Sequence, residues 1–188
     1  MALIVGGVVM AGVFLPFTLT HGPTSYNIEH EILGWDVLRW GLVMGTVPEV
    51  LIGTGLWLLR GTIAGGRRVT SAALGVMSVA MVVFAAMNLA FGGIGPPFDL
   101  FFLAPASAVV AATTWMRGLA RALLVALAAA YCTATALGLI PLETSDSFGG
   151  YRIFGLVAYA GVGVLWALFG ALSGGHDQSR TRRAPSPS

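Results

Sequence analysis

Long apolar runs, separated by short polar breaks, dominate the chain from its first residues to near its last. Each run is long enough to cross a hydrocarbon core of roughly 30 Å as a helix that rises about 1.5 Å per residue. The pattern therefore predicts an all-α polytopic integral membrane protein, a bundle of six transmembrane helices. The expected spans are residues 2–20, 37–59, 69–91, 98–116, 118–140 and 151–172.

The breaks between the runs have the composition of loops. They include "THGPTS", "RGTIAGGRR", "GGIGPP" and "PLETSDSFGG", which are rich in glycine, proline, serine or charge. Only "RGLAR" divides the fourth run from the fifth, but Arg117 and Arg121 would be costly at the centre of a bilayer. We therefore expect a tight turn there rather than one long helix.

The two ends of the chain differ in character. The opening "MALIVGGVVMAGVFLPFTLT" lacks the basic start and the A-x-A cleavage pattern of a signal peptide, so we expect a retained helix. Five spans would remain if it were cleaved. Residues 1–173 are expected to form the membrane domain, and residues 174–188, "GGHDQSRTRRAPSPS", a disordered basic cytoplasmic tail.

Composition supports the same class of protein. The chain is 56% hydrophobic and only 10% charged, whereas about a quarter of the residues in a soluble domain are charged. A formal net charge of +2 is too small to indicate nucleic-acid binding. The single cysteine, Cys132, excludes a disulfide or a CxxC metal pair within the chain.

Arginines gather at alternate connections between the expected spans. Those on one side are Arg60, Arg67, Arg68, Arg117, Arg121, Arg180, Arg182 and Arg183. The other side carries only Arg39 and Arg152, among most of the carboxylates. By the positive-inside rule the arginine-rich side is cytoplasmic, so both termini are expected in the cytoplasm of a bacterial-type plasma membrane.

The connection "HGPTSYNIEHEILGWDVLRW" carries a candidate outer-loop polar site, consisting of His21, Glu29, His30 and Glu31. These side chains could bind a metal ion or a cationic substrate. However, no HExxH or paired-cysteine pattern supports a metal. A short acidic helix on the outer leaflet with solvated histidines is the favoured alternative, and neither a metal site nor a cofactor is predicted. Arg39 is expected to pair with Asp36.

Glu49 is the stronger candidate, because it lies near the middle of the second expected span, directly behind Pro48. An ionised carboxylate is costly there, so the group should be protonated, paired or beside water. Such a residue is a functional-site hypothesis by default. The alternative is a neutral acid whose proton bonds a carbonyl group freed by Pro48, where the helix is expected to kink.

Four other polar residues could share a cavity with Glu49. They are Asn88, Asp99, Tyr131 and Thr135, of which the last two lie one helical turn apart. Each also has an ordinary structural explanation: an interhelical hydrogen bond for Asn88, a helix start for Asp99 and an interface aromatic for Tyr131. The shared cavity is therefore a hypothesis beside these alternatives.

Enzymes are the weakest class of function for this sequence, and no cofactor is expected. No expected span contains a histidine, which leaves a transmembrane bis-histidine haem unsupported. The phosphate-binding GxxxxGK[ST] loop and the GxSxG serine elbow are both missing.

Two functions remain open. The favoured one is a non-catalytic accessory or structural component whose glycine- and alanine-rich helices dock against a membrane-protein partner or a second copy of the chain. The alternative is a small proton- or cation-linked transporter or channel that uses Glu49. The lipid bilayer is the expected surrounding in both cases, and nucleic acid is not an expected partner.

Overall fold

The computed structural model describes residues 1–20, 31, 33–91, 98–139 and 153–181. Every regular element in this part is helical, so the all-α prediction is confirmed for the described residues. The elements are α1 (Ala2–Thr20), α2 (Val37–Gly45), α3 (Val47–Ala64), α4 (Arg68–Phe91), α5 (Leu100–Thr113), α6 (Gly118–Gly138), the π-helix η2 (Leu156–Gly161) and α8 (Val162–Thr181).

Within the described residues, four helical stretches are long and apolar enough to cross a membrane. They are Arg39–Ala64, which joins most of α2 to α3, together with Arg68–Phe91, Gly118–Gly138 and Ile153–Ser173. At 14 residues, α5 covers about 21 Å, less than the roughly 30 Å of a hydrocarbon core. The assignment of α1 and α5 as two further spans stays a prediction.

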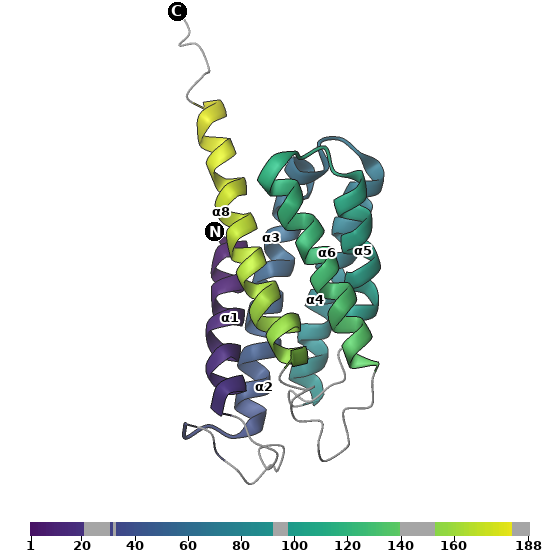
Figure 1. Ribbon diagram of the computed structural model, residues 1–188. Coiled ribbons are helices and arrows are strands. Elements are labelled where there is room, and N and C mark those ends of the chain that lie inside the picture. The colour runs from purple at the N-terminus through teal and green to yellow at the C-terminus, as the bar shows by residue number, and fades with distance from the viewer. Residues whose placement is uncertain (21–30, 32, 92–97, 140–152, 182–188) are drawn as a thin grey trace, which may run out of the picture.

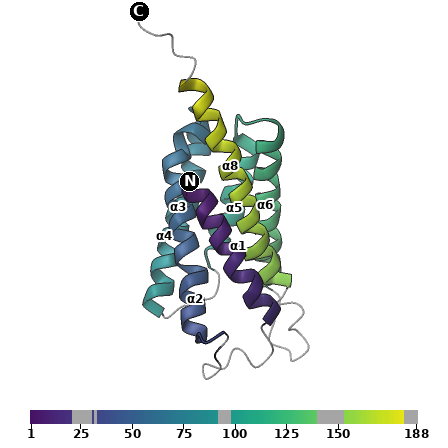
Figure 2. The same ribbon diagram turned by 90° about the vertical axis from the view of Figure 1, so that its left-hand side faces the viewer.

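The helices form an up-and-down bundle (Figures 1 and 2). Most helices pack against their neighbours in sequence: α3 against α4, α4 against α5, and α5 against α6. The bundle closes because α1 packs against both α3 and α8, which also contacts α6. The α3–α4 and α5–α6 turns lie at one end of the bundle, where α8 also ends (Figure 1).

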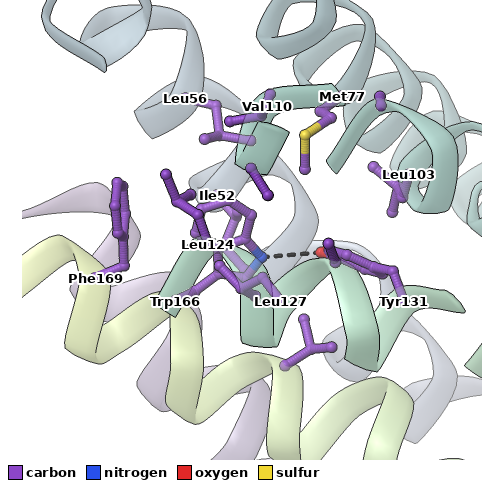
Figure 3. Packing of buried hydrophobic residues seen from close by; sticks show 14 of the residues in the cluster. Ile52, Leu56, Met77, Leu103, Val110, Leu124, Leu127, Tyr131, Trp166 and Phe169 are labelled. Atoms are coloured by element: carbon purple, nitrogen blue, oxygen red, sulfur yellow. Dashed lines mark hydrogen bonds between the residues drawn. The ribbon is translucent and has the colours of Figure 1, made fainter. Parts of the chain in front are cut away.

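A large apolar core runs through this bundle (Figure 3), and a small second cluster surrounds Phe14. Trp166, Phe169 and Tyr131 are the largest fully buried side chains of the large core. The outer surface is also apolar; Leu58, for example, is 73% exposed and Phe102 is 58% exposed. Helices that are apolar on all sides are typical of a bundle in lipid, because lipid tails accept such side chains without the cost that water imposes.

Glycine allows an especially close approach of α1 and α8. A Cβ atom at Gly163 would lie 2.7 Å from the carbonyl oxygen of Gly7 and 2.8 Å from the backbone nitrogen of Ala11. Two helix backbones can come this near only where side chains are missing. The glycines of the last helix are therefore used, at least here, for packing within the chain.

The helix that carries Glu49 is interrupted where Pro48 predicts a kink. α2 ends at Gly45, Thr46 is not helical, and α3 begins at Val47 with Pro48 in its first turn. The backbone nitrogens of Thr46 and Val50 still donate to the carbonyls four residues earlier, both over 3.0 Å. The two pieces therefore form one interrupted helix, since proline cannot donate the bond that would close it.

Side chains join the two turns at the arginine-rich end. Arg67 Nη1 donates to the carbonyl oxygen of Thr113 over 2.7 Å, and Trp115 Nε1 donates to that of Thr62 over 3.0 Å. Thr114 is extended, with ψ of 147°, so α5 ends before the expected limit at residue 116. The predicted turn between α5 and α6 is confirmed, but it occupies residues 114–117.

Near the opposite end, Asp36 caps α2. Its Oδ1 accepts a hydrogen bond of 2.7 Å from the backbone nitrogen of Arg39, and Oδ2 lies 3.7 Å from Nε of the same residue. The expected pairing of Arg39 with Asp36 is confirmed. Leu33 and Gly34 have positive φ angles of 55° and 75°, so an outer-leaflet helix cannot continue through them.

The last helix extends past the start of the expected tail, because α8 continues to Thr181. Adding residues to an existing helix needs no new nucleation, which is the costly step in helix formation. Polar residues such as those from 174 onward can therefore remain helical when an apolar helix precedes them.

Candidate functional site

The carboxyl group of Glu49 is buried deep in the bundle. Glu49 lies in the first turn of α3, and its side chain is only 3% exposed. Along the interrupted helix it stands about 15 Å from Arg39 and about 22 Å from Ala64, at 1.5 Å per residue. Both ends of this helical stretch therefore lie more than two helical turns from Glu49.

Asp99 brings a second carboxyl group into the same region. It precedes α5, and its backbone carbonyl accepts hydrogen bonds from the nitrogens of Phe102 and Leu103 over 2.9 and 2.8 Å. Its side chain makes no capping hydrogen bond and is 9% exposed. Asp99 thus stands at a helix start, as expected, but its carboxyl group is not used to cap the helix.

Glu49, Asp99 and Tyr131 line one small cavity. Its other lining residues are Met10, Met81, Leu100, Leu103, Ala158, Tyr159 and Val162. The volume is about 10 Å³, close to the 10–15 Å³ or so that a single water molecule needs. Oε2 of Glu49 and Oδ1 of Asp99 are buried and have no hydrogen-bond partner within the described part of the chain.

A hydrogen bond to Trp166 fixes the role of the Tyr131 hydroxyl group (Figure 3). Trp166 Nε1 donates to it over 2.9 Å, and an indole nitrogen can only donate. The tyrosine oxygen is therefore the acceptor in this bond, which leaves its own proton available to a second partner. Because Tyr131 also lines the cavity, its hydroxyl group can donate a hydrogen bond to a small molecule or a carboxylate there.

A π-helix contributes to the wall of the cavity. Ala158 and Tyr159 belong to η2, and Val162 follows it at the start of α8. π-Helical turns are rare and occur frequently at functional sites, because the extra residue disturbs the regular helical hydrogen bonds. Tyr159 is held against α1 by a stacked contact with Phe14, with ring centroids 4.5 Å apart.

The structure places the other two intramembrane candidates elsewhere. Asn88 is buried against Gly45, where a Cβ atom would overlap its amide group. Thr135 Oγ1 donates to the carbonyl oxygen of Leu100 over 3.3 Å and to that of Tyr131 over 2.8 Å. Neither residue lines the cavity, although Thr135 ties α6 to the start of α5 beside it.

Of the four outer-loop candidates, the structure describes Glu31 alone. Glu31 is exposed, whereas His21, Glu29 and His30 lie outside the described residues. Within the described ranges, no group of three or more histidine, cysteine, aspartate or glutamate side chains could hold a metal ion.

Two residues of this region had no functional prediction from the sequence. Thr46 Oγ1 is also buried without a partner among the described residues, and Thr46 lies three residues before Glu49, at the break between α2 and α3. The spacing of three residues between Thr46 and Glu49 is a sequence signal that could have indicated Thr46. Trp166 had none, because nothing local to an apolar run indicates that its indole nitrogen will meet Tyr131.

No protein-family model matches the chain, and comparisons with curated proteins and with solved structures gave no match. The chemistry of the cavity therefore carries the functional argument. A carboxylate in apolar surroundings is costly unless a proton or cation neutralises it. With two carboxyl groups, one hydroxyl proton and room for about one water, the cavity can hold a proton or a small cation, but no larger substrate.

Proposed function

We propose that this chain is a multi-pass membrane protein that binds a proton or small cation between Glu49 and Asp99, and acts as a small proton- or cation-linked transporter or channel. The main support is that two buried carboxyl groups from separate parts of the chain line one cavity, and that one oxygen of each has no hydrogen-bond partner among the described residues. A purely structural pair would be expected to satisfy those oxygens within the protein.

The second candidate is a non-catalytic accessory component that docks against another membrane protein or a second copy of the chain. Its support is the outer face of α6, where Ala129, Cys132, Thr133 and Ala136 are exposed small residues. However, the small residues Gly7 and Gly163 are already buried in the contact between α1 and α8, so they are not available to a partner. Because some of the small residues serve packing within the chain, they support a docking role less strongly than the sequence alone suggests.

A proton-flux measurement tests the first candidate. In liposomes containing the full chain and an internal pH dye, an external acid step should acidify the interior faster than in protein-free liposomes. Glu49→Gln should remove that difference, because an amide has nearly the same shape but cannot take up and release a proton as a carboxylate does. Glu31→Gln is the matched control, since Glu31 is exposed and outside the cavity.

Labelling by a hydrophobic carbodiimide completes this test, because the reagent modifies protonated carboxyl groups in apolar surroundings. Glu49 should be labelled in the natural chain, less so as the pH rises, and the labelled protein should lose proton flux. Equal flux in the natural chain and Glu49→Gln, without labelling of Glu49 at any pH, would rule out the proposed transport.

The proposed location is a bacterial-type plasma membrane, with both termini cytoplasmic and lipid around the bundle. Support comes from the joined α3–α4 and α5–α6 turns, which bring Arg60, Arg67, Arg68, Arg117 and Arg121 to one end. The positive-inside rule makes that end cytoplasmic. Six spans and a basic cytoplasmic tail of residues 174–188 belong to the same proposal, as does the absence of a nucleic-acid partner.

Cysteine accessibility tests this orientation. Cys132 is exposed, so the background chain carries Cys132→Ala. In that background, Ser145→Cys should react with a membrane-impermeant maleimide added to intact cells, whereas Ser179→Cys should react only after the cells are opened. The reverse order of reactivity would show that the arginine-rich end faces outward.

A further inference from the structure

A basic pocket lies at the arginine-rich end, far from the Glu49 cavity. Arg60 at the end of α3 and Arg67 and Arg68 at the start of α4 line it, together with Gly61, Ala64, Gly66, Ser71 and Ala72. It is an open pocket of about 360 Å³. Three arginine residues thus line a space large enough for a phosphate group.

These arginines have no acidic partner that would account for their clustering. Among the described side chains, the one ion pair is Arg39 with Asp36, near the other end of the bundle. Like charges at close range repel each other unless an anion lies between them. The first turn of α4 begins at Arg68, and its unbonded N–H groups add further positive potential.

Two of the three guanidinium groups are held in position. The Cζ atom of Arg60 lies 4.3 Å from the centre of the Trp57 ring, and its Nη1 reaches across to Gly75 of α4. Arg67 is held by its hydrogen bond to the carbonyl oxygen of Thr113. A ligand therefore meets arginines whose conformational freedom is already reduced, which lowers the entropic cost of binding.

The surface beside the pocket is apolar. Trp57 is 51% exposed, and Leu58 on α3 and Val76 on α4 also point outward. A charged pocket that adjoins an apolar helix surface fits an amphipathic ligand with an anionic head and hydrocarbon chains. A free phosphate ion would use only the charged part.

We propose that this pocket binds the phosphate group of an anionic lipid, whose acyl chains lie along the exposed apolar sides of α3 and α4. Arginine suits this role because its planar fork donates two hydrogen bonds to phosphate oxygens at once. The lipid would hold the α3–α4 turn at the membrane surface. This site is independent of proton or cation binding by Glu49.

Native mass spectrometry of the full chain in an uncharged detergent tests the proposal. The protein is titrated separately with phosphatidylglycerol, phosphatidylcholine and inorganic phosphate. Arg60→Gln/Arg68→Gln is compared with Arg117→Gln/Arg121→Gln, which removes the same charge at the same end but outside the pocket. Circular dichroism checks that each variant keeps its helix content.

We expect one phosphatidylglycerol molecule per chain, bound roughly tenfold to thirtyfold more weakly by Arg60→Gln/Arg68→Gln. The Arg117→Gln/Arg121→Gln variant should stay within about twofold of the natural chain, because its charges do not touch the lipid. If the first variant loses helix content, Arg68→Gln alone serves, since the Arg68 side chain makes no hydrogen bond or ion pair with other described residues.

Three results would overturn the proposal. Equal weakening in both double variants would show diffuse attraction rather than a pocket. Binding of phosphatidylcholine as tightly as phosphatidylglycerol would show that the net charge of the head is not recognised. Inorganic phosphate bound as tightly as the lipid would show that the acyl chains contribute nothing and that the ligand is a free anion.

Discussion

Gly163→Leu should destabilise the bundle by about 3 kcal/mol or more, which is above the usual cost of an overpacked core. Even the first carbon of the new side chain would fall 2.7 Å from the carbonyl oxygen of Gly7 and 2.8 Å from the nitrogen of Ala11. Both are backbone atoms, so no side-chain rotation can relieve the overlap. α1 and α8 would have to separate along their contact.

The matched control is Gly12→Leu in α1, where an added Cβ atom meets nothing within 4 Å. Leucine there should leave stability unchanged or raise it slightly, because glycine is a poor helix former. Thermal unfolding in detergent, followed by size-exclusion chromatography, measures both variants. A Gly163→Leu midpoint equal to that of Gly12→Leu would contradict the close contact of the first and last helices.

Trp166→Ala should lower the free energy of unfolding by about 3–5 kcal/mol, the usual range for removing a large aromatic side chain from a core. Trp166 is 1% exposed, packs edge-on against Phe169 with ring centroids 6.0 Å apart, and donates to Tyr131. Its loss would leave a large void at the centre of the bundle. Denaturant titration in detergent, followed by circular dichroism, measures the change.

Trp57→Ala is the control. Because Trp57 is half-exposed on the outer surface, this substitution should lower the free energy of unfolding by less than about 1 kcal/mol. Tyr131→Phe separates packing from hydrogen bonding. It keeps the ring but strands the buried indole nitrogen of Trp166, which should cost about 1–3 kcal/mol. Equal losses for Trp166→Ala and Trp57→Ala would contradict the central position of Trp166.

The sequence predicts the helices well where apolar length alone determines them. α4 and α6 begin within one residue of the expected positions and end within two, and α1 has the expected bounds. The α5–α6 turn was placed less well, because "TTWMR" carries no glycine or proline before Gly118 to show where the helix ends. Tertiary contacts decide that point, chiefly the reach of Trp115 to α3.

The candidate site was predictable only in part. Glu49 stands out because a charge in an apolar run is conspicuous in any sequence, and Pro48 beside it indicates the interruption of the helix. That Asp99 shares its cavity, whereas Asn88 does not, depends on how α4 and α5 rotate against α3. Such rotation is weakly encoded in helices that are apolar on every side, because no polar face fixes their orientation.

The contact between α1 and α8 also sets the order in which the molecule can assemble. The ribosome makes α1 long before it makes Val162, where α8 begins. Until then the glycine-lined side of α1 lacks the helix that covers it in the finished bundle. The bundle can therefore close only late in synthesis, and a chain that stalls earlier would leave that side of α1 uncovered.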